Sequence, residues 1–101
     1  MEALTTIKNS IKKELPDARV ILFGSYARGQ QNNDSDIDVL VITKQQLSQN
    51  LKMHYRSLLR KQLVKMLIPA EVLLMSEGEV ENKKNLHGHI VKTIVEEGKE
   101  L

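Results

Sequence analysis

The chain has 101 residues, of which 41% are apolar and 28% charged, a size and composition typical of one folded domain and not of a disordered segment. Its formal net charge of +2 is too small to indicate nucleic-acid or membrane binding by itself, and without cysteine the chain has neither disulfides nor thiolate metal sites. The first residues lack the apolar segment of a signal peptide, and every apolar stretch is far shorter than the ~20 residues of a membrane helix. We therefore expect a cytoplasmic protein.

The first half of the chain predicts one helix and two strands. Apolar residues at helical spacing indicate an amphipathic helix over residues 2–15, which Pro16 ends. A β-branched and aromatic run indicates a buried strand over residues 20–23. A second run, over residues 37–43, is apolar on both faces beyond its first residues and is therefore expected at the centre of a sheet.

The second half predicts two helices separated by a strand. Apolar residues from Leu51 to Leu67 repeat at intervals of three and four, which indicates a helix of several turns with Ser48 as its N-cap. Residues 71–75 indicate a third strand, and apolar residues between 86 and 95 indicate a closing helix that Gly98 ends. This order of elements predicts an α/β (α+β) fold, a small mixed sheet covered by helices, with the whole chain as one domain.

The stretch GSYARG, from Gly24 to Gly29, directly follows the first predicted strand. It begins like a Walker phosphate loop, but Gln30 and Gln31 stand where that motif requires Lys and Ser/Thr, which excludes the assignment. Two interpretations stay open. The glycines either only permit a tight turn, or they belong to a phosphate-binding turn in which Ser25 caps a short helix beginning at Tyr26.

Two carboxylates stand at the head of the second predicted strand. Side chains alternate along a strand, so Asp36 and Asp38 are expected to project from one face roughly 6–7 Å apart. Unpaired, they would repel each other, and Mg²⁺ suits a site with few hard oxygen ligands. A calcium loop is excluded because Val39 and Gln45 replace its Gly and Glu. If the third predicted strand pairs beside the second, Glu71 joins the two aspartates.

The polar residues between the glycines and these carboxylates also have structural explanations. Arg28 either adds positive charge near a phosphate or pairs with a nearby carboxylate and fixes the turn, and we favour the second role. Asp34 lies in the run NNDSD and is a typical turn former, and Ser35 is expected to cap or brace the same turn.

The motif formed by residues 24–29, a short polar spacer and residues 35–38 (SDID) resembles the signature of DNA polymerase β-type nucleotidyltransferases. Nearly the whole chain resembles the minimal nucleotidyltransferases of that superfamily. The resemblance implies a polymerase β-like fold and transfer of a nucleoside monophosphate, AMP from ATP, with two Mg²⁺ ions and pyrophosphate leaving.

The resemblance also implies roles for individual residues. Asp36 and Asp38 would bind Mg²⁺, and Glu71 would be the third acid, which helps to activate the attacking hydroxyl. Many relatives have Asp at this third position, so the longer Glu71 is a departure. The nucleotide-binding candidates are the polar and glycine positions of the motif, Gly24, Ser25, Arg28 and Ser35.

The chain is too short to include an obvious acceptor-binding domain, so we expect a second protein to supply the acceptor. Minimal nucleotidyltransferases are commonly paired with HEPN-domain proteins in toxin–antitoxin modules, and the resemblance implies an antitoxin that adenylylates a tyrosine of such a partner. The alternative is a catalytically weak domain that regulates a partner by contact alone. The basic residues between 52 and 65 are better explained by a solvated helix face than by nucleic-acid binding, because stacking aromatics are scarce. The oligomeric state stays open.

Overall fold

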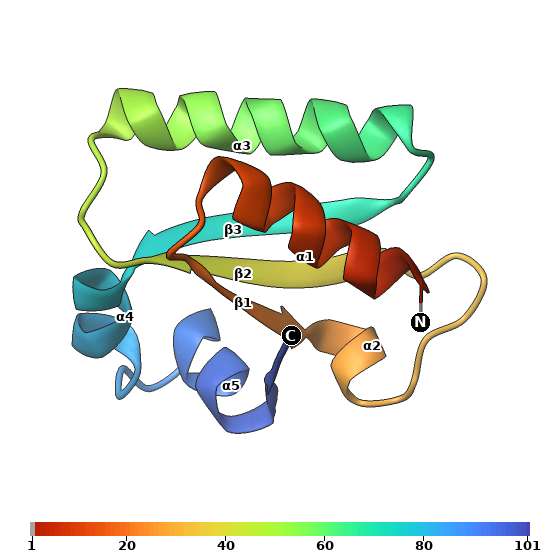
Figure 1. The fold of residues 1–101 in the computed structure, drawn as a ribbon. Helices are drawn as coiled ribbons and strands as arrows, with labels where there is room; N and C mark the ends of the chain where they lie inside the picture. The colour runs from red at the N-terminus through yellow and green to blue at the C-terminus, as the bar shows by residue number, and fades with distance from the viewer. Residues whose placement is uncertain (1) are drawn as a thin grey trace.

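Residues 2–101, which the structure describes, form one four-stranded mixed sheet with helices on both faces (Figure 1). The structure is a computed structural model. In chain order its elements are α1 (Glu2–Glu14), β1 (Arg19–Phe23), α2 (Gly24–Ala27), β2 (Ile37–Thr43), α3 (Gln49–Lys65), β3 (Ala70–Ser76), α4 (Glu77–Lys83), α5 (Ile90–Glu97) and β4 (Lys99–Glu100). The strand order is β3-β2-β1-β4, in which only the β2–β3 pair is parallel. None of the helices described is long and apolar enough to cross a membrane.

Two apolar layers sandwich the sheet. Val39 and Val41 of β2 are fully buried and pack with α1 and α3, whereas Leu40 and Ile42 point to the opposite face, where Ile94 of α5 covers them. Figure 1 shows α1 and α3 on one side of the sheet and α4 and α5 on the other. Each fully buried Leu, Ile or Val contributes about 1.5–3 kcal/mol. The prediction of a central strand at residues 37–43 is therefore confirmed.

The predicted helices and strands are confirmed with small shifts at their ends. Ser48 is the N-cap of α3, and its side chain accepts a hydrogen bond of 3.2 Å from the backbone N–H of Leu51. The closing helix α5 begins later than expected, at Ile90, and ends before Gly98 as predicted. Two elements were missed in the predictions from sequence, the helix α4 and the short edge strand β4.

The fold brings three chain segments to one end of the sheet. The last residue of β1, Phe23, lies opposite Asp38 near the start of β2, and Asp38 in turn lies opposite Glu71 near the start of β3. The helix α3 supplies the crossover that makes β2 and β3 parallel, so both strands begin at this same end. The turn after β1, which contains α2, lies next to this same end of the sheet (Figure 1).

Candidate functional site

The candidate carboxylates lie together at the end of the sheet where β2 and β3 begin. Asp38 and Glu71 are register partners on neighbouring strands, and Asp36 precedes β2 by one residue. Alternation along β2 places Asp36 and Asp38 toward the same face, and register places Glu71 on that face too. The third strand pairs beside the second, which is the condition under which Glu71 was expected to join the two aspartates. We call Asp36, Asp38 and Glu71 the carboxylate edge.

The electrostatics of the carboxylate edge are those of crowded negative charge. Burial raises the pKa of the half-buried Asp38 carboxyl, and the negative charges of Asp36 and Glu71 raise it further, while Arg28 acts in the opposite direction. Asp36 and Glu71 are themselves exposed. The charged form of Asp38 is therefore disfavoured by its surroundings, as expected for a carboxylate near like charges.

Within residues 2–101, no three His, Cys, Asp or Glu side chains are gathered closely enough to hold a metal ion. The carboxylate edge is thus a shared location of three acids and not a compact ligand cluster. Like charges repel, and the two exposed side chains are solvated separately in water. The donor set, hard carboxylate oxygens with crowded negative charge, nevertheless fits Mg²⁺, which binds through one or two carboxylates and takes its other ligands from water and phosphate.

Gly24 couples the turn after β1 to the carboxylate edge. Its φ is +73°, a backbone conformation that favours glycine, and a Cβ at this position would collide with the carboxylate of Asp38. Gly29 also has a positive φ, +68°, but its Cα faces open space. The turn-forming explanation is sufficient at Gly29, whereas at Gly24 close approach to Asp38 is a second reason for glycine.

The predicted cap of the short helix is wrong. The helix α2 begins at Gly24 and not at Tyr26, its N-cap is Phe23, and that cap has no side-chain hydrogen bond. Ser25 therefore lies inside the first turn instead of capping it. The backbone N–H of Arg28 donates a 3.2 Å hydrogen bond to the C=O of Gly24, so the helical turn begins directly after β1, two residues earlier than the Ser25 pattern suggested.

The remaining motif residues have local contacts. The Arg28 guanidinium lies 3.6 Å from the Glu97 carboxylate of α5 and donates a 3.1 Å hydrogen bond to the side chain of Gln30. This agrees with the structural role favoured for Arg28, although both ion-pair partners are more than 40% exposed (43% and 44%) and such a pair contributes little to stability.

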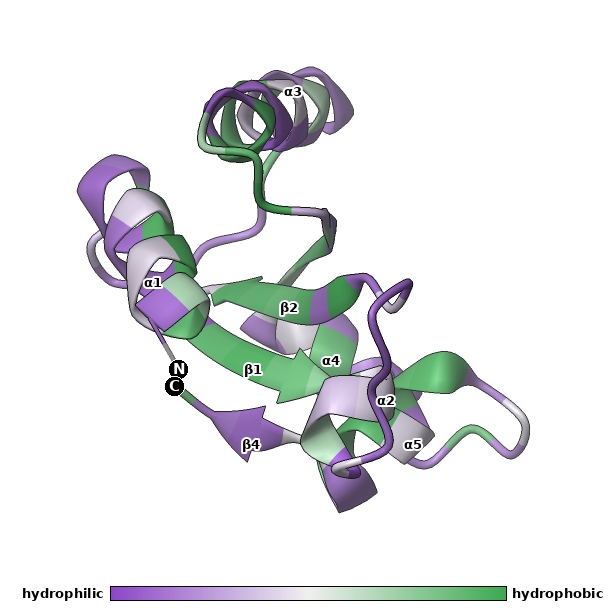
Figure 2. Cartoon of the chain, turned by 90° about the vertical axis from the view of Figure 1, so that its right-hand side faces the viewer, coloured by the Kyte–Doolittle hydropathy of each residue, from purple (hydrophilic) through white to green (hydrophobic). Residues whose placement is uncertain are grey.

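The loop between α2 and β2 is mostly hydrophilic, as Figure 2 shows, and is braced by its own side chains. Ser35 Oγ accepts a 2.9 Å hydrogen bond from the backbone N–H of Asn32, and Asn32 Oδ1 accepts one of the same length from the backbone N–H of Asp34. The bracing role predicted for Ser35 is confirmed, and Asp34 lies in the turn as expected of a turn former. These bonds position the residues that lead into Asp36.

The sequence of this chain matches a known domain family over almost its full length. The profile of the family described as "Nucleotidyltransferase domain" matches residues 4–101. A protein of Methanocaldococcus jannaschii named "Putative protein adenylyltransferase MJ1379" is 32% identical over 96 residues, which are 95% of this chain and 87% of that protein. MJ0141 of the same organism, which carries the same description, is 47% identical over 47 residues, 45% of this chain and 48% of that protein. The match thus spans about half the length of MJ0141.

Solved structures with the same fold include one described as a nucleotidyltransferase and two toxin–antitoxin complexes. A structure described as a nucleotidyltransferase superposes with a TM-score of 0.71 at 24% identity, covering 100% of this chain and 99% of that one. A toxin–antitoxin structure with AMP-PNP has a TM-score of 0.63 at 20% identity and covers 99% and 72% of the two chains. A third, of a tri-AMPylated Shewanella oneidensis HEPN toxin in complex with an MNT antitoxin, has a TM-score of 0.58 at 20% identity and covers 97% and 67%. At these identities the likeness shows the fold.

Proposed function

Because this chain belongs to the nucleotidyltransferase domain family, we propose that it transfers AMP from ATP to a hydroxyl group of a partner protein, with Mg²⁺ as cofactor. One observation supports this proposal above the others. Asp38 is the register partner of Glu71, follows Asp36 by two residues and lies directly against Gly24, so the two halves of the motif meet at one place.

In this proposal Asp36 and Asp38 hold the metal, with Glu71 as the third acid. Bound there, Mg²⁺ would neutralise charge that develops on the transferring phosphate and help to orient the triphosphate. Gly24 has no side chain to block the triphosphate, and Ser25, Arg28 and Ser35 are the further candidates for contacting it. The partner's hydroxyl oxygen forms a bond to the α-phosphorus while the bond to the β-phosphate oxygen breaks, pyrophosphate leaves, and Glu71 accepts the hydroxyl proton.

The proposed acceptor is a tyrosine of a HEPN-domain protein, with this chain as the antitoxin of the pair. Support comes from the structural relative in which a tri-AMPylated HEPN toxin is bound to an MNT antitoxin, and from the relatives named as protein adenylyltransferases. A tyrosine hydroxyl is a suitable nucleophile because its pKa, about 10, is far lower than that of an aliphatic alcohol.

The test is an incubation of this chain with ATP, Mg²⁺ and the product of the neighbouring gene, which the proposal expects to be a HEPN-domain protein, followed by intact mass spectrometry of that protein. The proposal expects a gain of one or more AMP groups, and peptide mapping should place them on tyrosine. The matched control is Asp36→Asn with Asp38→Asn, which keeps side-chain shape but removes both charges. A HEPN protein that gains no AMP mass from the unsubstituted enzyme contradicts the proposal.

A second candidate function is regulation of a partner by contact alone. It is favoured by one observation, that no three potential ligands within residues 2–101 are gathered closely enough to hold a metal ion. The same double variant separates the two functions. A contact regulator carrying Asp36→Asn and Asp38→Asn still neutralises its partner in a growth assay, whereas an enzyme with these substitutions does not.

A further inference from the structure

The helix α3 has an unusual charge composition for a surface helix. Its sequence, QNLKMHYRSLLRKQLVK, contains five basic residues and no acidic residue. Arg56 and Arg60 are four residues apart, as are Lys61 and Lys65, and like charges at this spacing destabilise a helix. Lys52 pairs with Glu79 at 2.5 Å, but the ion pairs found within residues 2–101 include none of the other four cations. A helix face that is merely solvated does not need so many positive charges without negative ones.

Apolar side chains are interspersed among these cations. Met53 is 61% exposed and Val64 is 69% exposed, both large apolar side chains left in water. With Arg56 and Arg60 they occur at intervals of three, four and four residues, which places them along one side of the helix. Such a side, with two cations between two exposed apolar side chains, is typical of a helix that contacts another protein.

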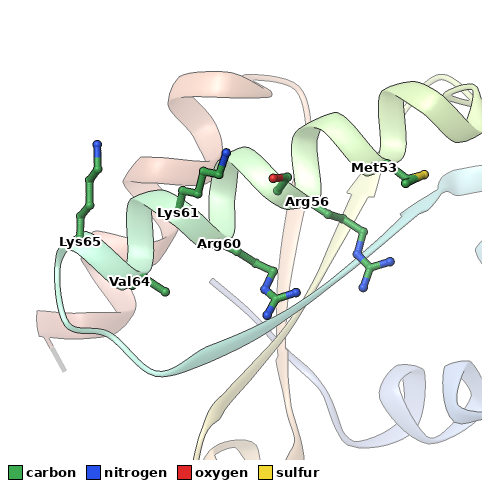
Figure 3. Close-up of a pocket in the computed structure, with 7 residues that line it drawn as sticks. Met53, Arg56, Arg60, Lys61, Val64 and Lys65 are labelled. Atoms are coloured by element: carbon green, nitrogen blue, oxygen red, sulfur yellow. The ribbon is translucent and has the colours of Figure 1, made fainter.

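These side chains line a shallow hollow of about 630 Å³ on the outside of the molecule (Figure 3). Figure 3 shows Arg56 and Arg60 extending from α3 toward the strand below it, while Lys61 and Lys65 extend away from that strand. We call Met53, Arg56, Arg60, Lys61, Val64 and Lys65 the α3 strip.

The α3 strip continues onto the edge of the sheet. The strand β3 is the outermost strand on this side, so one of its backbone edges is not paired within the sheet described. A neighbouring hollow of about 370 Å³ shares Met53 and Arg56 with the strip and is also lined by Leu73, Leu74 and Met75 of β3. Natural proteins usually protect a long apolar edge strand with charges or cover it with another segment. Here Arg56 and Arg60, which extend toward β3, supply charges beside this edge (Figure 3).

The C-terminal end of the strip lies at the same end of the sheet as the carboxylate edge. α3 ends at Lys65, and Leu67, which is 90% exposed and has a φ of +58°, turns the chain toward β3. Glu71 follows Leu67 by four residues. Figure 1 shows the C-terminal end of α3 over the same end of the sheet as the start of β2. Asp38 and Glu71 lie on the opposite face of the sheet, the face of Leu40 and Ile42, so a protein docked along α3 would extend around this end of the sheet to meet them.

We propose that the α3 strip is the docking surface for the acceptor protein, which meets the cations of the strip with acidic side chains and the exposed Met53 and Val64 with apolar ones. This inference rests on the proposed function, because it identifies the occupant as the acceptor. Charge complementarity selects an acidic partner for four cations without acidic neighbours on their helix. The exposed Met53 and Val64 favour a protein over a nucleic acid, since single-strand binding uses aromatic stacking and none of the strip residues is aromatic.

The test measures binding of the proposed HEPN-domain partner, the product of the neighbouring gene, to the full chain by isothermal titration calorimetry at low and high salt. Arg56→Glu with Arg60→Glu should weaken binding about tenfold or more and reduce its salt dependence. The matched control, Lys13→Glu with Lys44→Glu, makes the same charge change at exposed lysines outside the α3 strip and should change the affinity less than about twofold. Met53→Gln with Val64→Gln should weaken binding several-fold while keeping good helix formers. Far-ultraviolet circular dichroism of each variant confirms that it folds.

Several outcomes overturn the docking proposal. It fails if the HEPN protein does not bind the unsubstituted chain, if the α3 double variant binds within about twofold of it, or if the control loses as much affinity as the α3 variant. It also fails if a labelled 20-nucleotide RNA is bound through Arg56 and Arg60 while HEPN binding is unchanged by their reversal.

The failure of docking and the failure of the proposed function give different results. If the chain transfers AMP and the KM for the HEPN protein is the same with and without Arg56→Glu and Arg60→Glu, the docking proposal is overturned. The enzymatic proposal is unaffected by that result. Binding that depends on the α3 strip, without any AMP transfer, supports docking and overturns the enzymatic proposal. The Asp36→Asn, Asp38→Asn variant should still bind the HEPN protein, because the strip is distinct from the carboxylate edge.

Discussion

The carboxylate edge and the α3 strip concentrate opposite charges by different means. At the edge, strand register and the close approach of Gly24 fix the position of Asp38 beside Glu71. On the strip, flexible cations project from a helix whose buried side, with Leu59 and Leu63, holds it on the sheet. Both regions place like charges near one another at a cost in stability, which suggests that each serves a binding partner. The backbone-fixed region suits chemistry that needs exact placement, and the flexible region suits recognition that needs only complementary charge.

Removal of the Asp38 charge is expected to have the largest effect: AMP transfer should fall strongly while the stability of the fold does not. Asp38→Asn is expected to reduce AMP transfer on the order of 10²-fold or more, because a charged metal ligand is lost. Its thermal unfolding midpoint should equal or exceed that of the parent, because the raised pKa of Asp38 shows that folding disfavours its charged form. Calorimetry and a transfer assay measure the two effects. A large fall in the midpoint would mean that Asp38 is needed for the fold and would contradict this account.

Replacement of Gly24 should affect both stability and activity. Gly24→Ala adds a methyl group that collides with the Asp38 carboxylate and has an unfavourable φ, so a loss of about 2 kcal/mol or more is expected, with reduced AMP transfer. Gly29→Ala is the matched control, since it has a similar positive φ but open space around its Cα. It should cost about 1 kcal/mol and leave transfer unchanged. Equal effects of the two variants on transfer would show that contact with Asp38 is unimportant.

The pair between Glu79 and Lys52 should make stability depend on acid pH. The hydrogen bond from Lys52 lowers the pKa of Glu79 below its ordinary value of 4.5. The stabilisation is therefore fully present above pH 4.5 and is lost as the pH falls through the lower, folded-state pKa. Glu79→Gln, which retains the capping-box geometry, should remove about 1 kcal/mol at neutral pH and flatten this part of the stability profile. Glu81→Gln, on a more exposed glutamate, is the comparison and should leave the profile nearly unchanged.

The smallest expected effect concerns the stability of α3 itself. Arg56→Glu alone replaces the repulsion between the two arginines by an attraction between Glu at position 56 and Arg60. The free energy of unfolding should therefore rise by about 0.3–0.5 kcal/mol. The same variant should weaken binding of the HEPN partner. Urea unfolding measures the first effect, and destabilisation by this substitution would show that the cations of the strip already have stabilising contacts.

The sequence predicted the fold because its strands are marked by short β-branched runs and its helices by regular apolar spacing. The helix α4 escaped prediction because none of its residues is buried, so it has no apolar periodicity. A signal was available, since Ser76 and Glu79 form a capping box. The cap assigned to Ser25 was wrong because the first helical hydrogen bond, from the N–H of Arg28, already ends at the C=O of Gly24, which leaves Ser25 inside the turn.

The sequence predicted where the candidate site lies in the fold, but it did not predict the contacts within the site. The i, i+2 spacing of Asp36 and Asp38 indicates that both lie on one face of a strand. Glu71 joins them if the second and third strands pair, and the observed register places Glu71 opposite Asp38. The contact between Gly24 and Asp38 depends on how β1 and β2 align, and no local pattern in the sequence encodes that alignment. The side-chain directions of exposed acids depend on solvent and ligands, so sequence spacing does not determine them.

The central claim is tested most directly by anomalous diffraction from crystals of this chain grown with Mn²⁺, as a substitute for Mg²⁺, and a non-hydrolysable ATP analogue. The account predicts an anomalous peak coordinated by Asp36 and Asp38, with the triphosphate lying over Gly24. A nucleotide bound elsewhere, or bound with Asp36 and Asp38 directed into solvent and no peak beside them, would contradict it.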